Sequence, residues 1–583
     1  MADNGKANEL TSESNTTWLL LKPNSDVQQM NAKINKVIDK EVVIKDKKYF
    51  LFPLKDKYLY NYVNGKKSSL GSIIDVMSFS TIAILILLIA CFNFMNLAIA
   101  LTAKRYGEAG IKKTLGSARK NIIFQFLGES IILSLLSFCF ALLIVAWVLP
   151  AFNNFSPSKR ILTIPFSNPT VMFAFTGLAI VAGLLAGLYP AILLSSVSAI
   201  NILKRNLSPK GKLSYFRQGL IVFQFIISVF FITFTFIFLK QAKYIHTMDL
   251  GLTKENILVF ENHENISNHQ ATFKSELLSI PEVSSVCFSN SMPFVNVNGS
   301  ANVDWPGRIP TIDNNFPLIN TDYGFLKTLQ PKLLRGRFFE EGLKTDEDNF
   351  VVNETAAEVI KQANPVGQVI TVNGRKGTII GVVKNFQTNH LFNPYFPVII
   401  KINPQETYFT VIRFLPGNNK TLLEKLKKKY KQFESDYPFE PDLADDLFYR
   451  QNFKSEAAVL VGIFAAIAIF LACLGLFGLA AFSAEKRTKE IGVRKINGAS
   501  IYSVILLLLR AYAKWVTIAI CIGVPISFLL GKAFLGSFAF HTSLPLWAFA
   551  VGPLIVICIA LLTVSLLTFK AAMRNPVESL RYE

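Results

Sequence analysis

The sequence is poor in residues that build metal centres and catalytic clusters. It has five histidines, which form no ligand pattern, and six cysteines, which include no Cys-x-x-Cys spacing. All cysteines except Cys287 lie in long apolar runs, so the polar part of the chain has no pair for a disulfide. His263, Glu264 and His269 could hold a metal in principle, but a solvated loop explains them better. No Ser-His-Asp or Cys-His arrangement stands out, so we expect neither a metal site nor enzyme activity.

A phosphate-binding loop is also absent. The pattern Gly-x-x-x-x-Gly-Lys-Ser/Thr occurs nowhere, so this chain cannot by itself hydrolyse ATP in the P-loop manner. A secondary transporter driven by protons or sodium normally needs charged residues inside its membrane helices. Five of the seven apolar runs described below have none near their centres. If the chain takes part in transport, the energy must therefore come from elsewhere.

The first 75 residues lack the hydrophobic core of a signal peptide and contain no spanning segment. Their pattern predicts strands at residues 17–22 and 49–53 around a helix at 27–39. We expect this segment to be the remnant of a first extracytoplasmic domain, with a preceding span and most of that domain missing. The alternative is a short N-terminus that crosses the membrane without help.

Long apolar runs dominate the rest of the chain, which is 51% hydrophobic with a mean hydropathy of +0.37. A helix needs about 20 apolar residues to cross about 30 Å of hydrocarbon. The sequence therefore predicts a polytopic α-helical membrane protein in two repeated units, with a large α/β extracytoplasmic domain. Seven runs are long enough to span: 76–103, 121–150, 170–195, 219–240, 457–483, 505–533 and 545–570.

The net charge of +20 is concentrated in short segments between these runs, which makes nucleic-acid binding an unlikely explanation. Segment 104–120 holds six basic residues, and segments 204–217 and 486–495 hold five each. On the alternate side, 151–169 holds two and 534–544 none. Because cytoplasmic loops carry the excess of Lys and Arg, these basic segments and the C-terminus should face the cytoplasm. The N-terminal segment and residues 242–455 should then face the outside.

These observations predict seven consecutive parts. They are a remnant of an extracytoplasmic domain (1–75), a first three-helix membrane unit (76–196), a cytoplasmic basic linker (197–218), a transmembrane helix (219–241), an extracytoplasmic α/β domain (242–455), a second three-helix membrane unit (456–572) and a cytoplasmic tail (573–583).

A basic motif occurs twice, each time directly after an apolar run. A Glu four residues before a Lys or Arg can pair with it on a helix, and glycines permit tight turns. We expect each copy to form a stiff helix that lies across the membrane face. A partner protein would dock on this helix and exert force on it. Topogenic charge alone would not explain the matched Glu and Gly. A shift of 382 residues aligns Arg105, Glu108, Gly110, Lys112, Lys113 and Gly116 with Arg487, Glu490, Gly492, Arg494, Lys495 and Gly498.

Two further charges, Glu129 and Arg510, fall near the inner boundaries of their spans. Charges inside membranes are usually functional, although side chains at a boundary can also snorkel to the interface. Because Glu129 aligns with position 511, we hypothesise that Glu129 and Arg510 pair across the pseudo-twofold axis relating the two units.

The segment 242–455 has the pattern of a mixed α/β domain. An Asn373-Gly374 turn between alternating strands predicts a hairpin. We expect a binding or coupling domain. Further strands are predicted at 256–261, 283–289, 350–352, 397–402 and 408–414, and helices at 270–279, 354–362 and 420–433.

Together these residues resemble the ABC transporter permeases of the FtsX/MacB type, in their doubled form. The second copy of the basic motif, residues 487–499, carries the resemblance most specifically. The first copy departs from the family pattern at Ala109 and Thr114. Other matching segments are 217–218, 224–228, 249–256, 381–386 and 575–577.

The resemblance implies a permease subunit in the bacterial inner membrane that binds a separate ABC ATPase in the cytoplasm. No cofactor is expected on this chain itself, because ATP would act through that subunit. Closure of the ATPase would move the spans and the external domain, for export, efflux or release of a lipoprotein or peptide. Further implied partners are a second permease or a second copy of this chain, and a periplasmic or outer-membrane protein.

An ATP-independent membrane sensor or scaffold with a ligand-binding external domain is the alternative function. A receptor would usually append an output domain, and only about 13 residues follow the seventh run. A membrane enzyme is disfavoured by the lack of a catalytic cluster. Co-purification of an ATPase would separate the transporter from both.

Overall fold

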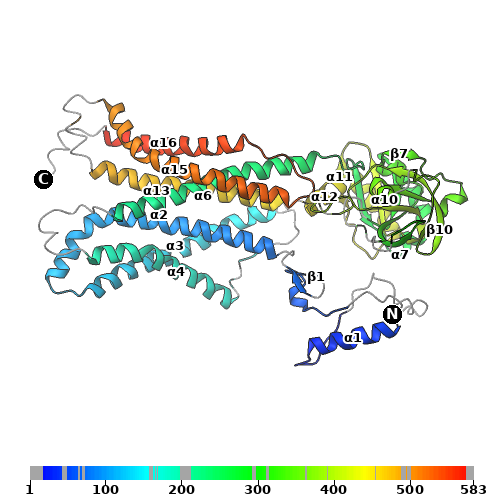
Figure 1. Cartoon of the computed structure of the whole chain (residues 1–583), viewed down its shortest axis with the longest axis horizontal. Helices are drawn as coiled ribbons and strands as arrows, with labels where there is room; N and C mark the ends of the chain where they lie inside the picture. Colours follow the sequence, from blue (N-terminus) through cyan, green and yellow to red (C-terminus); the bar gives the residue numbers. More distant parts are fainter. Residues whose placement is uncertain are drawn as a thin grey trace. The chain divides into compact units, whose positions relative to one another are not determined.

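The structure is a computed structural model that describes residues 18–41, 49–63, 66–68, 73–155, 162–164, 166, 168–196, 212–291, 297, 299–309, 314–360, 364–389, 391–452, 455–486, 494 and 500–572. By its internal contacts the chain divides into two compact units, Met1–Ala90 and Cys91–Glu583. The boundary falls within one long helix, α2 (Ile73–Thr114), drawn in blue in Figure 1.

In the first unit, helix α1 (Val27–Glu41) confirms the predicted helix, but the two predicted strands are wrong. The described residues 18–22 and 49–53 form no strand. The unit instead contains a 3-10 turn, η1 (Leu54–Asp56), and a short antiparallel pair of strands, β1 (Asn61–Val63) and β2 (Lys66–Ser68).

Side chains of α1 explain why residues 49–51 pair with no strand. Asn35 donates from Nδ2 to the Tyr49 carbonyl at 2.7 Å and accepts from the Tyr49 N–H at 2.8 Å. One turn earlier, the Asn31 side chain accepts from the N–H of Leu51 at 2.7 Å. These amides satisfy backbone groups that a neighbouring strand would otherwise pair.

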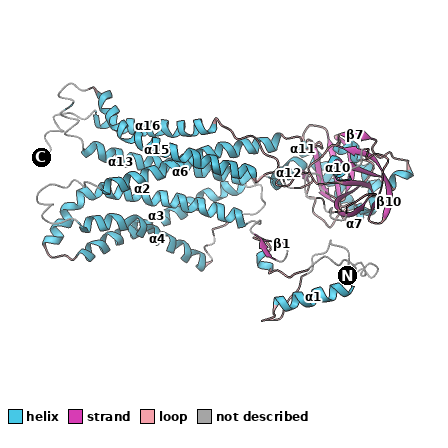
Figure 2. Ribbon diagram, viewed as in Figure 1, coloured by secondary structure: helices cyan, strands magenta, loops and turns pink. Residues whose placement is uncertain are grey.

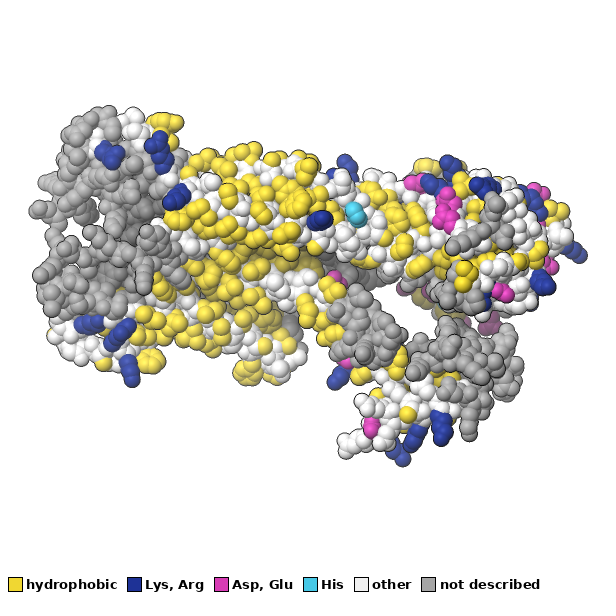
Figure 3. Space-filling model, viewed as in Figure 1, with side chains coloured by type: hydrophobic (Ala, Val, Ile, Leu, Met, Phe, Trp, Pro, Cys, Tyr) yellow, Lys and Arg dark blue, Asp and Glu magenta, His cyan; other side chains and the backbone are white. Residues whose placement is uncertain are grey.

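Seven helices are long and apolar enough to cross a membrane, which confirms the predicted number of spans among the residues that the structure describes. On the face in Figure 3, hydrophobic side chains cover the helical part of the second unit and charged side chains gather over its external domain. Besides α2, the helices are α3 (Arg119–Phe155), α4 (Pro169–Ser196), α6 (Lys212–Thr247), α13 (Ser455–Lys486), α15 (Ile501–Gly536) and α16 (Ala548–Ala572).

Helix α6 is the most enclosed of the membrane helices. Of its most apolar 18-residue stretch, 67% is buried, whereas none of the corresponding stretch of α3 is buried. Helices α13, α15 and α16 all pack against it (Figure 2). The shared apolar core consists of Ile221, Phe225, Val229, Ile232, Ala472, Leu476, Val516, Ala519, Val556, Ala560 and Val564.

Two polar side chains on α6 fasten it to α13. Gln224 donates from Nε2 to the Leu471 carbonyl at 2.6 Å, and the Ser228 hydroxyl, which lies 3.1 Å from the Gln224 carbonyl of its own helix, is also 3.4 Å from the Ala468 carbonyl. Polar side chains that bond across helices inside a bilayer contribute about 0.6–2 kcal/mol each. The sequence segment 224–228 therefore contributes polar contacts between the two spans α6 and α13.

Helices α3 and α4 pack closely against each other. The hydroxyl of Ser134 donates to the Ala179 carbonyl at 2.7 Å. A Cβ on Gly187 would lie 2.4 Å from the Ser130 hydroxyl, so only glycine allows this approach. Gly183 faces the same helix and completes a Gly-x-x-x-Gly spacing typical of tightly packed membrane helices.

The described residues of the external domain form one 11-stranded mixed sheet, in the order β11-β8-β10-β9-β5-β6-β4-β12-β3-β13, with β7 paired to β10. All five individually predicted strands are confirmed, as is the hairpin of β9 and β10, whose turn residues Asn373 and Gly374 both have positive φ. The strands are β3 (Ile257–Glu261), β4 (Val283–Ser289), β5 (Ser300–Asp304), β6 (Asn315–Thr321), β7 (Leu333–Gly336), β8 (Phe350–Asn353), β9 (Val369–Val372), β10 (Arg375–Val383), β11 (Ile399–Ile402), β12 (Phe409–Phe414) and β13 (Asp442–Leu443).

Short helices complete this domain, and the three predicted ones are confirmed as α8, α10 and α11. Helices α8 and α11 bury Phe273, Leu277, Leu422 and Leu426 against the strands at the β3 end of the sheet. The fold class is therefore as predicted, an α-helical membrane part with an α/β external domain. The helices are α7 (Glu264–Asn268), α8 (Gln270–Leu278), α9 (Phe325–Leu329), α10 (Glu354–Ile360), α11 (Asn419–Phe433) and α12 (Ala444–Asn452), with 3-10 turns η2 (Lys344–Glu347) and η3 (Pro404–Glu406).

We expect Asp346→Asn to destabilise the external domain by about 2–3 kcal/mol, since hydrogen bonds to charged groups contribute about that much. The buried Asp346 carboxylate accepts from both terminal guanidinium nitrogens of Arg337, at 2.6 and 2.7 Å, and from the Glu340 N–H at 3.0 Å. These contacts, Arg337 first, lower the pKa of Asp346. The stabilisation is therefore present at neutral pH and is lost as pH falls through the lowered pKa.

Hydrogen exchange of residues 337–350 in the full-length protein would measure the effect. The matched control is Asp304→Asn, because Asp304 pairs with Arg308 while its side chain stays 64% exposed. Exposed pairs contribute about 0–1 kcal/mol. If residues 337–350 exchanged hydrogen equally slowly in both variants, the stabilising role of the Asp346 carboxylate would be contradicted.

Candidate functional site

The first copy of the basic motif lies on the last turns of α2. The helix runs without a break past Gly110, and Arg105 lies on it too. The chain turns only at Gly116, whose φ is +92°. Its N–H bonds to the Lys113 carbonyl at 3.0 Å, and the next N–H bonds to the Lys112 carbonyl at 2.9 Å, a Schellman cap. The expected helix is present in this copy and is continuous with the span, and of the two motif glycines it is Gly116 at which the chain turns.

A chain of polar contacts joins this motif to α3. Lys112 and Glu108 form the predicted ion pair, at 2.8 Å. The same ammonium donates to Oε1 of Gln125 at 2.9 Å, and Gln125 in turn donates to Glu129 at 3.2 Å. Four polar side chains from two helices thus form one connected row, which the spacing within the motif alone could not reveal.

The neighbouring basic residue, Lys113, fastens α2 to the end of α4. Its ammonium donates to the Ser195 carbonyl at 2.6 Å, and Nε of Arg119 lies 3.3 Å from the Ser195 hydroxyl. Cations stabilise the carbonyl-bearing end of a helix, and α4 ends at Ser196. The ends of α2, α3 and α4 are therefore held together by two cations.

The second copy of the motif falls mostly outside the described residues, so its contacts stay a prediction. This applies to the ion pair of Glu490 with Arg494, although Arg494 itself is described as helical and exposed. The residues outside the described ranges are Arg487, Glu490, Gly492, Lys495 and Gly498.

Glu129 and Arg510 are not brought together. Glu129 lies on α3, which packs against α4, and accepts from Gln125. Arg510 is exposed on α15, which packs against α6 and α16. No ion pair joins these two side chains, both of which are described. The two repeated units therefore do not approach each other through this pair of charges.

At the other end of α6, two sequence segments matched to the family converge. Asp249 follows α6 directly, and its carboxylate lies 2.9 Å from the ammonium of Lys384. This hydrogen bond lowers the pKa of Asp249 and raises that of Lys384. Beside the ion pair, the N–H of Gln387 donates to the Leu250 carbonyl at 3.0 Å. Residues 249–256 and 384–387 thus form a joint at the base of the external domain, here called the outer joint.

Gly251 is required by the geometry of the outer joint. Its φ is +79°, which L side chains rarely adopt, and a Cβ would lie 2.2 Å from the Asn385 carbonyl oxygen. The backbones of the two segments are therefore in direct contact at this residue.

The segment after the outer joint also binds the connection between α15 and α16. The Leu391 carbonyl accepts from the N–H of Ala539 at 3.0 Å. The rings of Phe392 and Phe538 stack with centroids 4.6 Å apart. The same connection returns to α6, because Gln241 donates to the Phe540 carbonyl at 3.0 Å. Nothing in the sequence pattern predicted this contact, which joins residues about 150 positions apart.

Metal ligands do not gather anywhere in the described ranges: no three His, Cys, Asp or Glu side chains there are placed to hold an ion. The contacts described above form two clusters, one at the motif end of α2 and one at the outer joint after α6.

Two family models match the chain. The FtsX-like permease C-terminal model matches residues 80–199 and 462–576, and the MacB-like periplasmic core domain model matches residues 219–425. The second match covers the outer joint and most of the sheet. Neither the models nor the relatives below give a sign of an ATP-independent sensor.

Curated relatives carry permease names. The uncharacterized ABC transporter permease YknZ of Bacillus subtilis is 24% identical over 277 residues, which cover 45% of this chain and 68% of YknZ. The macrolide export ATP-binding/permease protein MacB of Chlorobium phaeobacteroides is 25% identical, over 49% of this chain and 46% of MacB. MacB of Aggregatibacter actinomycetemcomitans is 29% identical, over 29% and 28%. This chain spans less than half the length of the MacB proteins it matches.

Among solved structures, the periplasmic region of MacB from Actinobacillus actinomycetemcomitans matches with 16% identity and a TM-score of 0.27, over 35% of this chain and 95% of that one. The family models lie along the chain in the same order as its parts, with two three-helix membrane units flanking α6 and the external domain. The chain therefore belongs to the ABC transporter permeases of the FtsX/MacB type.

Proposed function

We propose that this permease couples ATP hydrolysis by a separate cytoplasmic ABC ATPase to movement of its external domain. The observation that carries the proposal is that residues 249–251, just after α6, and the α15–α16 connection contact neighbouring segments of the external domain, residues 384–387 and 391–392. In this proposal the two basic motifs and the C-terminus face the cytoplasm, residues 242–455 face outward, and the membrane is the bacterial inner membrane.

The basic motifs are the proposed docking sites for the ATPase. In the first copy, the Glu108–Lys112 pair extends through Gln125 to Glu129, and Lys113 holds the end of α4. Force applied to such a motif reaches three helices at once, because α2 is continuous with it and polar contacts hold α3 and α4. Each motif presents a glutamate followed by two basic residues, so a partner protein could form ion pairs with charges of both signs at fixed positions.

Transmission to the outside would run through α6. Its buried position prevents it from moving alone, and Gln224 and Ser228 tie it to α13. Its last turns carry Phe238, Ala242 and Ile245 into the hydrophobic core shared with the external domain. A displacement of α6 therefore displaces the floor of that domain.

The moved substrate is a separate proposal. The MacB relatives are named for macrolide export, and this chain would serve export, efflux or release of a lipoprotein or peptide. Its further partners would be a second permease or a second copy of itself, and a periplasmic or outer-membrane protein. The ATP-hydrolysing site would belong to the ATPase subunit, so this chain would need no cofactor of its own.

Orientation can be tested by labelling cells with a membrane-impermeant maleimide, in a variant without native cysteines. We expect Ser435→Cys, in the external domain, to be labelled in cells whose outer barrier alone is opened. Leu115→Cys, in the first motif turn, should be labelled only after full permeabilisation. The reverse pattern would overturn the proposed orientation.

Docking can be tested by purifying the full-length chain in mild detergent with its ABC ATPase. We expect Glu490→Lys and Arg494→Glu each to reduce bound ATPase and stimulated ATP turnover about tenfold or more, because each reverses one sign of the motif. Lys428→Glu, on the external helix α11, is the charge-matched control and should change neither. Retention of the ATPase by both motif variants would rule out docking at this motif.

The outer joint can be tested with Gly251→Ala, which should leave ATPase binding intact but abolish ATP-dependent changes in hydrogen exchange at residues 384–392. The added Cβ forces the two backbones apart. Gly307→Ala is the control, because Gly307 has a similar φ of +82° but open space around it. Normal ATP-dependent exchange in Gly251→Ala would show that the joint does not carry the movement.

A further inference from the structure

The guanidinium of Arg413, on strand β12, is only partly satisfied in the structure. Its Nε donates to the Thr328 carbonyl at 2.8 Å, but its Nη2 is buried and has no hydrogen-bond partner. Burial lowers the pKa of Arg413, and the charge of exposed Glu255 opposes this effect without forming an ion pair with Arg413. A charge taken out of water normally has a partner of opposite sign. Arg413 therefore lacks a counterion among the described residues.

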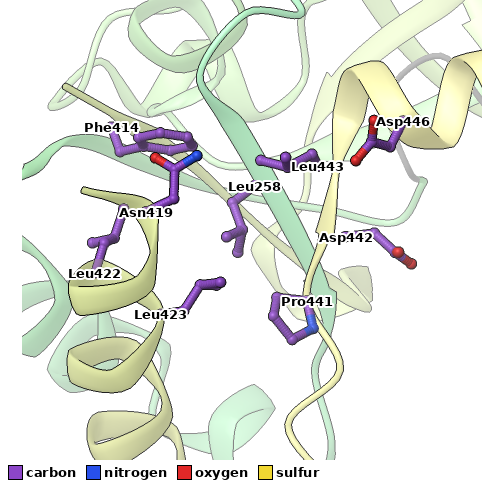
Figure 4. A pocket seen from close by; sticks show the side chains of 9 residues that line it. All are labelled: Leu258, Phe414, Asn419, Leu422, Leu423, Pro441, Asp442, Leu443 and Asp446. Carbon is purple, nitrogen blue, oxygen red and sulfur yellow. The ribbon is translucent and has the colours of Figure 1, made fainter. Parts of the chain in front are cut away.

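Arg413 points to the face of the sheet that α9 covers. Side chains alternate along a strand, and the next residue, Phe414, lies on the opposite face in the same apolar cluster as Leu258 (Figure 4). On its own face, Arg413 meets the carbonyl of Thr328, which belongs to α9. Strand β4 pairs Ser285 directly with Arg413. Directly paired residues of antiparallel strands place their side chains on one face, so Ser285 also lies beneath α9.

Two hydroxyls on this face are also without a nitrogen or oxygen partner. Ser285 Oγ and Thr328 Oγ1 are both buried and make no such hydrogen bond. Thr328 is completely buried, and its hydroxyl faces the thiol of Cys287, two residues from Ser285 on β4. Two strands and one helix thus bring three unpartnered polar groups together. These groups, here called the Arg413 site, are Arg413 Nη2, Ser285 Oγ and Thr328 Oγ1.

The chemistry of the Arg413 site selects its occupant. All three groups can donate a hydrogen bond. A water molecule could accept these bonds, but it would leave the guanidinium without a counterion, whereas an anion would supply both. The thiol of Cys287 does not supply the charge, because burial raises its pKa well above the usual value and keeps it protonated. Since the three donor atoms are closed off from solvent, a small ion fits them and a large one does not.

We propose that Arg413, Ser285 and Thr328 bind one small inorganic anion, of the size and charge of chloride, which serves as the counterion of the guanidinium. Arg413 as a whole is half-buried, so the ion can enter from the medium along its side chain. The site is separate from the basic motifs, and it does not depend on the proposed coupling to an ATPase.

A bound anion would tie α9 to the two strands beneath it. The end of α9 in turn holds the segment that follows the outer joint, because the Leu329 carbonyl accepts from the N–H of Thr253 at 2.9 Å. The hydroxyl of Thr253 also lies 3.2 Å from the side-chain oxygen of Gln330. An anion at the Arg413 site would therefore stabilise the base of the external domain.

The test titrates chloride against the full-length protein in detergent, with gluconate keeping the ionic strength constant. Gluconate is too large to reach the three enclosed groups. Hydrogen exchange of residues 325–330 and 409–414 is measured at each step. We expect exchange there to be about tenfold slower once chloride exceeds its dissociation constant tenfold, because the bound ion stabilises the closed site. The protein should also broaden the chloride NMR signal, and excess bromide should reverse this broadening.

Three hydroxyl variants connect the effect to the Arg413 site. Ser285→Ala and Thr328→Val should each raise the chloride concentration that gives half of the protection about tenfold or more, since each removes a hydrogen bond to an ion. Thr328→Ser keeps a hydroxyl and should respond like the unmodified protein. The matched control is Ser284→Ala, because Ser284 is exposed on the opposite face of the same strand.

Arg413→Gln should lose the chloride response entirely, because it removes the charge that the anion balances. Unchanged hydrogen exchange in β8 and β10 checks that the domain of this variant stays folded. Equal exchange of the unmodified protein in chloride and in gluconate would show that water alone completes the site, and would overturn the proposal. A chloride response that persists unchanged in Ser285→Ala or Arg413→Gln would place the ion elsewhere and would equally contradict it.

Discussion

The structure of the second unit depends on the continuity of helix α6. Inside hydrocarbon a backbone can satisfy its polar groups only within its own helix, so a spanning helix resists breaking there. Beyond the apolar run, the last turns of α6 gain a different support, because Ile245 and its neighbours are buried in the core of the external domain. One uninterrupted helix thus belongs to the membrane at one end and to a folded domain at the other.

The two membrane units share a sequence repeat but differ in what surrounds it. In the second unit, α13, α15 and α16 all pack on α6. In the first, α3 and α4 pack on each other through Gly187 and Ser130, and the apolar window of α3 has no buried residue within the described structure. The hypothesised pair of Glu129 and Arg510 assumed equivalent surroundings, which the neighbouring helices do not provide.

Sequence reasoning found the features that depend on local periodicity. Seven apolar runs, the Asn373-Gly374 hairpin and the Glu108–Lys112 pair each follow from spacing within one segment. It misjudged residues 49–53, whose backbone bonds to asparagine side chains of α1, because an alternating pattern does not show which group completes the hydrogen bonds. It could not find the contact of Leu391 with Ala539, since the approach of distant segments is set by the packing of the whole domain.

The strength of the ion pair in the outer joint depends on the salt concentration of the surrounding medium. Asp249 and Lys384 are 70% and 41% exposed, so dissolved salt screens their attraction, over about 8 Å at 0.15 M and about 3 Å at 1 M. The neighbouring bond between Leu250 and Gln387 joins uncharged backbone groups and is not screened in this way. Rising ionic strength therefore weakens the ion pair of the outer joint, while the backbone hydrogen bond beside it is not screened in the same way.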